Sequence, residues 1–277
     1  MTVEHGDTWA LGDRYEPYVG RWSRVVAQDF LMWLDLPAQL AWLDVGCGTG
    51  ALTEAILHRA KPHGVKGVDP SPAFIVHAKS QLGDPRATFA LADAQSLPFA
   101  SERFDAAVAG LVLNFVPQPV VAVAEMARTV RPRGTVAAYV WDYADKMELM
   151  RYFWDAAVEL DPRAFDLDEG RRFALCQPDA LTGLFESAGL LEVGVRSIDI
   201  CTRFRDFDDY WTPFLGGQAP APGYAMSLTE ERRVALRERI RAKLPRAGDG
   251  SIALMARAWA VRGRTRASRV ARKLVGV

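Results

Sequence analysis

The 277-residue chain has few cysteines, no long apolar run and no excess of charge of either sign. Its three cysteines, Cys47, Cys176 and Cys201, are an odd number without CxxC spacing, so they support neither a disulfide framework nor a structural zinc site. The first twenty residues are polar, and no window approaches the roughly 18 uninterrupted apolar residues that a membrane-spanning helix needs. These absences predict a soluble, cytoplasmic protein with no membrane partner.

The charges of the chain balance, because 34 lysines and arginines oppose 34 aspartates and glutamates. This balance removes any general attraction to nucleic acid, although residues 264–277 carry only basic charges. With 49% hydrophobic and 25% charged residues, the chain can bury a full core, which excludes a disordered or fibrous protein. We therefore expect a globular protein whose partner is a small molecule and not nucleic acid.

Short apolar segments alternate with helical patterns between residues 41 and 141. This alternation is typical of a parallel sheet with helices on both faces. We predict an α/β fold, a doubly wound, Rossmann-like, seven-stranded and mostly parallel sheet with an antiparallel last strand and a helical cap made of insertions. The expected segments are strands at 41–46, 64–69, 87–93, 104–113 and 135–141, helices at 51–59, 72–82 and 119–130, and a turn at 131–134.

A glycine cluster, LDVGCGTGAL at residues 43–52, lies between the first strand and the first helix of this region. Gly46, Gly48 and Gly50 have no Cβ, so the backbone of the turn can come close to a flat or anionic ligand. The spacing Gly46-x-Gly48-x-x-Ala51 also satisfies the dinucleotide pattern GxGxxG/A. The loop alone is therefore consistent with a nicotinamide or flavin protein, with another nucleotide-like ligand, or with a turn that binds nothing.

Two acidic residues end later strands of the same unit. Asp69 ends the second strand, where a carboxylate can accept hydrogen bonds from both hydroxyls of a ribose. Asp93 ends the third strand, and at this position along the sheet a carboxylate can accept a hydrogen bond from an adenine amino group. A dinucleotide protein has no particular need for an acid at this second position, so Asp93 favours an adenosyl ligand of another kind.

Five segments, LDVGCGTG, GVDPS, ADAQSLPF, FDAAVAGLVLNFVP and VRPRGTVAAYVW, resemble in order the motifs of class I S-adenosylmethionine-dependent methyltransferases. The resemblance is greatest to the small-molecule branch that includes the ubiquinone and menaquinone biosynthesis methyltransferases. It covers residues 41–141 well and residues 177–200 and 251–263 loosely. The resemblance implies S-adenosyl-L-methionine as the cofactor, with no obligatory metal.

The resemblance also implies roles for particular residues. The three glycines would pass beneath the methionine portion of the cofactor, with Asp44 on its amine side. Asp69 would hold the ribose, and Asp93 would hold the adenine amine with the Ala94 backbone beside it. The predicted cofactor contacts are Asp44, Gly46, Cys47, Gly48, Gly50, Asp69, Pro70, Asp93, Ala94, Gly110, Leu111 and Tyr18.

The chain departs from the quinone enzymes after the fourth strand. Those enzymes resemble one another there through a Gly-Leu-Arg-Asn segment, whereas this chain has Val112-Leu113-Asn114-Phe115, without the arginine. The chain also has neither the Asn/Asp-Pro-Pro-aromatic segment of the methyltransferases that modify amino groups of nucleic-acid bases nor any Pro-Cys pair. We therefore expect neither quinone specificity nor a nucleic-acid substrate.

Methyl transfer from a sulfonium needs little protein machinery, because the leaving group is already activated and alignment can supply most of the acceleration. A base is required only for a protonated acceptor, and no histidine follows His77 in this chain. The candidates for a catalytic role are His5, Tyr18, Asn114 and Tyr143. We predict methyl transfer to an oxygen, nitrogen or carbon of a small, largely apolar or aromatic acceptor; a non-catalytic binder of the same cofactor and a nicotinamide-dependent oxidoreductase stay open as alternatives. No feature of the sequence encodes the oligomeric state.

The segments outside the core are rich in aromatic residues, and ligands of such sheets bind at the carboxyl ends of the strands. We therefore expect these segments to cover that edge with a face that suits an apolar acceptor. The aromatic residues concerned are Trp9, Tyr15, Tyr18, Trp22, Trp141, Tyr143, Tyr152, Phe153, Trp154, Tyr210, Trp211 and Phe214. These residues are expected in four elements outside the core: a helix that Ser23 caps, a largely helical segment at 142–176, a bend at 216–223 and a helix at 228–244 capped by Thr229 or Ser227.

The predicted organisation is N-terminal cap helices at 1–40, a cofactor-binding core at 41–141, a cap insertion at 142–176, core completion at 177–201, a second cap insertion at 202–250, a last core strand at 251–263 and a basic tail at 264–277.

Overall fold

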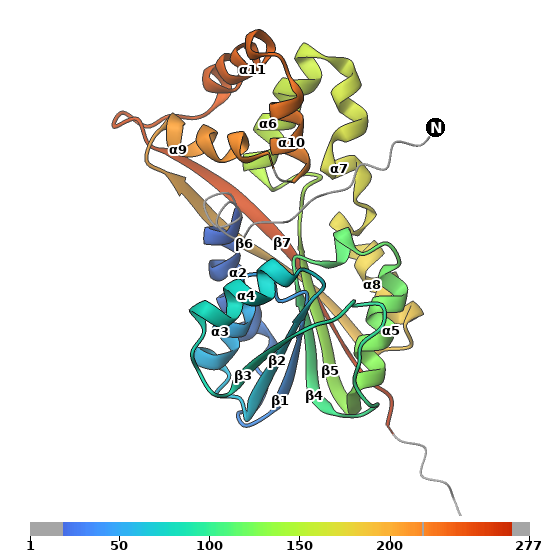
Figure 1. Cartoon of the computed structure of the whole chain (residues 1–277). Coiled ribbons are helices and arrows are strands. Elements are labelled where there is room, and N and C mark those ends of the chain that lie inside the picture. Colours follow the sequence, from blue (N-terminus) through green and yellow to red (C-terminus); the bar gives the residue numbers. More distant parts are fainter. Residues whose placement is uncertain (1–18, 218, 268–277) are drawn as a thin grey trace, which may run out of the picture.

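Figure 1 shows the computed structural model of the chain, which describes residues 19–217 and 219–267. Within these residues, seven strands form one sheet with the order β3-β2-β1-β4-β5-β7-β6. The first five strands are parallel, and β7 is antiparallel to both of its neighbours. The predicted doubly wound sheet is confirmed. The strands are Ala41–Val45 (β1), Gly64–Asp69 (β2), Ala87–Leu91 (β3), Phe104–Gly110 (β4), Val130–Trp141 (β5), Leu191–Phe204 (β6) and Ile252–Arg264 (β7).

Helices cover both faces of this sheet (Figure 1). Successive side chains of a strand point to opposite faces, so a strand buried on both sides needs two apolar layers. In β1, Trp42 packs into one apolar cluster, and Leu43 and Val45 pack into the other. The first layer holds Arg21–Leu34 (α2) and Ala51–Arg59 (α3), with Pro72–Gln81 (α4) beside them over β2 and β3; the second holds Pro119–Thr129 (α5) and Pro178–Ser187 (α8).

Helix α2 belongs to the core layer. It packs against α3 and against β6 and β7, and its Phe30 ring lies 4.7 Å from the ring of Tyr139 in β5. Ser23 does not cap this helix; its hydroxyl donates to the Gly20 carbonyl at 2.7 Å, one turn earlier. Residues 1–40 were predicted as cap helices; α2 buries its apolar face on the sheet, and at its start Arg21 pairs with Asp209 of the cap at 3.1 Å.

The two insertions pack against each other in a helical cap beyond the carboxyl ends of the parallel strands (Figure 1). Their aromatic side chains fill its interior: the Phe153 and Phe214 rings stack with centroids 4.6 Å apart, and the Tyr210 hydroxyl donates to the Leu149 carbonyl at 2.8 Å. The cap consists of Glu148–Leu160 (α6), Pro162–Leu167 (η3), Glu169–Arg172 (α7), Ala174–Cys176 (η4), Phe207–Trp211 (α9), Thr212–Gly216 (η5), Pro220–Ser227 (α10) and Glu230–Lys243 (α11).

Two local predictions are wrong for reasons of backbone geometry. A bend was expected at 216–223, but its second half forms the start of α10, because Pro220 occupies the first turn of this helix, where a proline is well tolerated. Residues 131–134 were expected in a turn, but they continue β5, with a register shift against β4 and a positive φ of 62° at Arg133. The helix predicted at 228–244 is observed as α11. Of its two candidate caps, Thr229 is the one that accepts a hydrogen bond from the Arg232 amide, at 3.4 Å.

Across the described residues, no helix has the length and apolar character to cross a bilayer.

Candidate functional site

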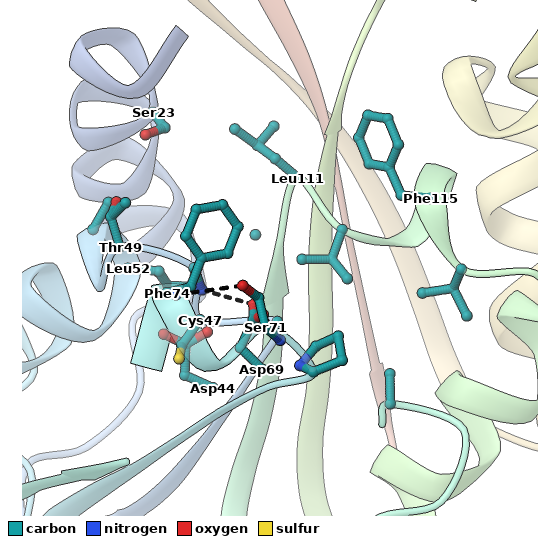
Figure 2. A pocket seen from close by; sticks show the side chains of 18 of the residues that line it. Ser23, Asp44, Cys47, Thr49, Leu52, Asp69, Ser71, Phe74, Leu111 and Phe115 are labelled. Atoms are coloured by element: carbon teal, nitrogen blue, oxygen red, sulfur yellow. Dashed lines mark hydrogen bonds between the residues drawn. The ribbon is translucent and has the colours of Figure 1, made fainter. Parts of the chain in front are cut away.

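A cavity of about 440 Å³ opens at the carboxyl ends of β1, β2, β4 and β5 (Figure 2). Its size falls within the range of roughly 300–1,000 Å³ that is usual for small-molecule sites. Val19 and Ser23, at the start of α2, complete a wall that is otherwise made of two halves: one comes from the glycine loop and the segments after β2 and β3, and the other comes from the segments after β4 and β5. We call these the acidic half and the aromatic half.

The glycine loop forms the floor of the acidic half. Gly46 has a φ of 70°, and a Cβ at this position would lie 2.3 Å from a methyl carbon of Val112. The amides of Gly46 and Cys47 both donate to the Val68 carbonyl, at 2.8 and 2.9 Å, which fixes β1 and β2 side by side at the cavity. Gly50 has another role: it precedes α3 with a φ of 94°, and a Cβ there would meet Leu82 at 2.7 Å.

Asp69 ends β2 with both of its carboxylate oxygens held by backbone amides. Gly48 donates to Oδ2 at 3.0 Å and Ser71 donates to Oδ1 at 2.8 Å. The side chain lines the cavity (Figure 2), and burial raises the pKa of this carboxyl above its ordinary value. Two donors fix the orientation of the carboxylate and leave lone pairs for further donors, as a ribose diol requires.

Asp44, in β1, lies fully buried below the same loop. Its Oδ2 accepts from the Thr53 hydroxyl at 2.6 Å, whereas its Oδ1 has no hydrogen-bond partner among the described residues. Burial above all, together with the nearby negative charge of Asp69, raises the pKa of Asp44 to about 7. A buried acceptor without a partner is costly, and the orphaned Oδ1 fits a cationic group such as the amine of S-adenosylmethionine.

Asp93 lies at the exposed rim of the acidic half. Its Oδ1 accepts from the Gln95 amide at 2.8 Å, so the carboxylate is held in a local turn. Ala94 is buried beside it and also lines the cavity. The hydrogen bond from Asp93 to an adenine amine stays a prediction.

The aromatic half is built around the ends of β4 and β5. Gly110 has to be a glycine, because a Cβ there would lie 2.6 Å from the hydroxyl oxygen of Tyr139. The next residue, Leu111, has a positive φ of 62°, a strained conformation that often marks functional sites. The remaining side chains of this half are mostly apolar or aromatic, and they are Val112, Phe115, Val116, Pro117, Tyr139, Trp141 and Tyr143.

The structure places most of the predicted site residues together. Those that line the cavity are Asp44, Gly46, Cys47, Gly48, Asp69, Pro70, Asp93, Ala94, Gly110, Leu111 and Tyr143. Gly50 is absent from this wall, and the amide nitrogen of Asn114 donates to the sulfur of Cys176 at 3.7 Å instead of facing the cavity. Two further candidates, His5 and Tyr18, lie outside the described residues. Of the described aromatic residues expected at the ligand, Trp141 and Tyr143 line the cavity, whereas Trp22, Tyr152, Phe153, Trp154, Tyr210, Trp211 and Phe214 do not.

Several residues of the site were not predicted from the sequence. Ser71 caps α4 with its side chain, and its amide also holds Asp69. Thr53 follows Asp44 by nine positions in the next helix and had no motif to mark it. Phe74, Gln95 and Tyr139 also line the cavity. Among the described residues, no three histidine, cysteine, aspartate or glutamate side chains gather as a possible metal-binding group.

Comparison with known proteins defines the class to which this site belongs. Residues 43–138 match the family model described as a methyltransferase domain. Over 137 residues, the chain is 31% identical to 2-methyl-6-phytyl-1,4-hydroquinone methyltransferase 2 from Oryza sativa subsp. japonica, an alignment that covers 49% of this chain and 39% of the rice protein. Over 167 residues it is 28% identical to a Staphylococcus aureus demethylmenaquinone methyltransferase, covering 56% of this chain and 69% of that protein.

A solved structure has the same fold. Phosphoethanolamine N-methyltransferase 2 of Haemonchus contortus, in complex with S-adenosyl-L-methionine, superposes with a TM-score of 0.58 at 14% identity, over 93% of this chain and 57% of that one. This likeness shows the fold, whereas the match to the family model and the two relatives support a class I S-adenosylmethionine-dependent methyltransferase domain of the small-molecule branch. The predicted class and the predicted cofactor are confirmed for this domain.

Proposed function

We propose that this protein transfers the methyl group of S-adenosylmethionine to a small, largely apolar or aromatic molecule, mainly by positioning the two reactants. One observation carries the proposal: a single cavity joins an acidic half that suits an adenosyl amino acid to an aromatic half that suits an apolar acceptor. When bound, the cofactor supplies a methyl group on a sulfonium that is already activated for transfer.

The residues of the chain hold the reactants and exclude water. Asp69, fixed by the Gly48 and Ser71 amides, binds the ribose hydroxyls. Asp44 receives the cofactor amine at its free oxygen. The buried side chains of Tyr139 and Trp141 close the aromatic half against solvent, which favours alignment of the reacting atoms in a dry site.

The two quinol-related relatives support an aromatic acceptor for this chain. The rice protein is named for a hydroquinone and the bacterial one for demethylmenaquinone. The position where quinone enzymes have arginine is Asn114 here, and its amide faces Cys176 and not the cavity. We therefore propose an aromatic acceptor other than the quinones that those enzymes methylate.

A transfer assay with radiolabelled S-adenosylmethionine and a panel of phenols, amines and hydroxy acids tests this proposal. We expect a labelled product with at least one neutral aromatic compound, and S-adenosylhomocysteine but not NAD(H) or NADP(H) should raise the melting temperature. Stabilisation by a nicotinamide cofactor alone would favour an oxidoreductase. Binding of S-adenosylhomocysteine without any product would favour a non-catalytic binder.

A further inference from the structure

The edge of the sheet opposite the cap (Figure 1) carries a second hollow, an open groove of about 640 Å³. Its floor is formed where β1 and β2 begin, and its sides come from the segment before β4 and from the starts of β3 and β5. We call it the basic groove, because the charged residues among those described that line it are Lys66, Arg86, Arg103 and Arg131, without any aspartate or glutamate. The basic groove shares no lining residue with the cavity, so occupation of the groove does not block the cavity.

Two of the four cations are already paired, and two are not. Arg86 and Arg131 each form an ion pair with a nearby aspartate, at 2.6 and 2.5 Å. Within residues 19–217 and 219–267, Lys66 and Arg103 form no ion pair. The exposed Glu102 precedes Arg103 in the sequence but does not line the groove. The groove therefore keeps an excess of positive charge, which attracts an anionic ligand.

One wall of the basic groove is apolar and is fixed to helix α5. Arg128 of this helix donates to the carbonyls of Leu97 and Phe99, at 3.0 and 2.7 Å. Glu125 of the same helix accepts from the Leu97 amide at 2.9 Å. The rings of Phe99 and Phe104 pack edge to face, with centroids 5.2 Å apart. The cations thus stand beside a preformed apolar wall and not on a flat polar surface.

The spread of the cations indicates the length of the ligand. In the sheet order β3-β2-β1-β4-β5, Arg86 precedes β3, Lys66 lies in β2, Arg103 precedes β4 and Arg131 lies in β5. Neighbouring strands are about 4.8 Å apart, so the four steps from β3 to β5 correspond to about 19 Å. A single phosphate or carboxylate cannot contact cations across this distance, whereas about six residues of an extended peptide can.

Positive charge continues along the same edge beyond the basic groove. Strand β7 runs antiparallel to β5, so its last residue, Arg264, lies at this edge. Arg133, Arg264 and Arg266 are exposed, and the exposed Glu192 lines a smaller hollow together with Arg264. Such an edge suits a chain with several negative charges better than a compact anion.

The aromatic side chains of the groove favour a peptide over a nucleic acid. Single-stranded nucleic acids stack their bases on accessible aromatic rings. Trp42 and Phe104 line the groove but are only 1% and 6% exposed, and Phe99 is half-buried against Phe104. An acidic peptide needs only cations for its carboxylates and an apolar wall for a side chain, and the segment 98–100 provides this wall.

Beyond the methyl transfer proposed above, we propose that the basic groove is a docking site for an acidic, extended segment of a partner protein, about six residues long. Lys66 and Arg103 bind carboxylates of this segment, and the wall around Phe99 contacts one of its apolar side chains. The docked partner lies at the edge opposite the cavity and leaves the cavity accessible.

Calorimetric titration with a synthetic peptide tests the proposal. The probe is the hexapeptide Glu-Glu-Leu-Glu-Glu-Leu, and its control is the same peptide with glutamine in place of every glutamate. We expect the acidic peptide to bind at low ionic strength, with an affinity that falls as salt is added. The neutral peptide should not bind. If the acidic peptide does not bind at low ionic strength, or if the neutral one binds equally well, the proposal is wrong.

A matched pair of double variants locates the binding site. Lys66→Gln/Arg103→Gln removes two positive charges from the groove, and Lys79→Gln/Arg246→Gln removes two from exposed positions that line neither the groove nor the cavity. We expect the groove variant to weaken peptide binding about tenfold, as for two partly exposed ion pairs, and the control variant to bind as the wild type does. Arg103→Gln alone changes only an exposed position and should weaken binding in the same direction.

The remaining outcomes separate this inference from the proposed function. The melting temperature and the affinity for S-adenosylhomocysteine should be unchanged in both double variants, because none of the four positions lines the cavity. Equal losses of peptide binding in the two double variants would show a general charge effect and overturn the docking site. Tighter binding of hexathymidylate than of the acidic peptide, lost in the groove variant, would make the groove a nucleic-acid site and also overturn the proposal. Neither result bears on methyl transfer.

Discussion

The two halves of the cavity are held in place in different ways. In the acidic half, backbone amides fix the functional side chains: Asp69 is bonded by Gly48 and Ser71, and the loop itself is bonded to Val68 of β2. In the aromatic half, side chains fix one another by packing, as in the contacts of Phe173 with Phe115 and Tyr143. Backbone bonds tolerate few changes of the loop, whereas a packed aromatic wall can be remodelled one ring at a time. The difference suits a shared cofactor and an acceptor that varies between relatives.

The largest effect is expected from filling the space above the glycine loop. In Gly46→Ala, the new Cβ would lie 2.3 Å from Val112 at a φ of 70°, so we expect a loss of about 3 kcal/mol in the free energy of unfolding, in cofactor affinity or in both. Gly48→Ala is the control, because nothing lies within 4 Å of its Cβ, and strain alone should cost about 1 kcal/mol. Chemical denaturation and calorimetric titration with S-adenosylhomocysteine measure the two quantities. Equal losses in both variants would contradict the role of the Val112 contact.

Removal of the Asp69 carboxylate should have the next largest effect. We expect Asp69→Ala to weaken S-adenosylhomocysteine binding by about 1.5–3 kcal/mol, the usual worth of a hydrogen bond to a charged group. Asp84→Ala, which removes an acid that forms an exposed ion pair with Arg86, is the control and should leave the affinity unchanged. An unchanged dissociation constant for Asp69→Ala in calorimetry would refute the assignment of this residue to the ribose.

A smaller effect should follow the ionisation of Asp44, whose pKa is raised to about 7 mainly by burial. Below that pH the carboxyl is neutral and attracts the cofactor amine less, so affinity should increase as the pH rises from 6 to 8, at most about tenfold per unit. Because the pKa is higher in the folded state than the ordinary value of 3.8, this group stabilises the cofactor-free protein at low pH, and that contribution is lost as the pH rises from about 4 to about 7. Calorimetric titrations with S-adenosylhomocysteine at several pH values test the change in affinity. The dependence of affinity on pH should disappear in Asp44→Asn.

The smallest effect is expected outside both halves, at the irregular start of β5. Arg133 is exposed and has a φ of 62°, a conformation that glycine adopts without strain. Arg133→Gly should therefore raise the free energy of unfolding by about 1 kcal/mol. Affinity for S-adenosylhomocysteine should not change. A destabilised variant would show that the arginine side chain contributes more than its backbone costs.

The contrast between the halves also explains which parts of the site could be predicted. Asp69 ends β2 and Asp93 follows β3 by two residues, so their place at the cavity follows from the local strand pattern. The aromatic half combines the end of β5 with turns from distant segments, and no spacing along the chain marks them as neighbours. In α6, the pattern that buries Phe153 in the cap is equally compatible with a ligand-facing helix.

Long-range packing also gives Gly50 and α2 surroundings that the local sequence does not reveal. Gly50 has the sequence context of a cofactor contact, but the reason for its missing Cβ is Leu82, which follows α4. Helix α2 precedes the first strand, and its amphipathic pattern fits a cap and a core layer equally well. Only the contact with Tyr139 and the neighbouring strands decides between them.

The paired strands β6 and β7 extend from the sheet to the cap helices and connect these two parts of the protein. Their pairing runs from Leu191 and Arg264 at one end to Phe204 and Ile252 at the other, and the ribbon continues from the sheet to the cap helices (Figure 1). A hydrogen-bonded ladder of this length transmits torsion and opposes hinge bending. The cap helices are therefore joined to the cofactor-binding sheet through paired strands as well as through loops.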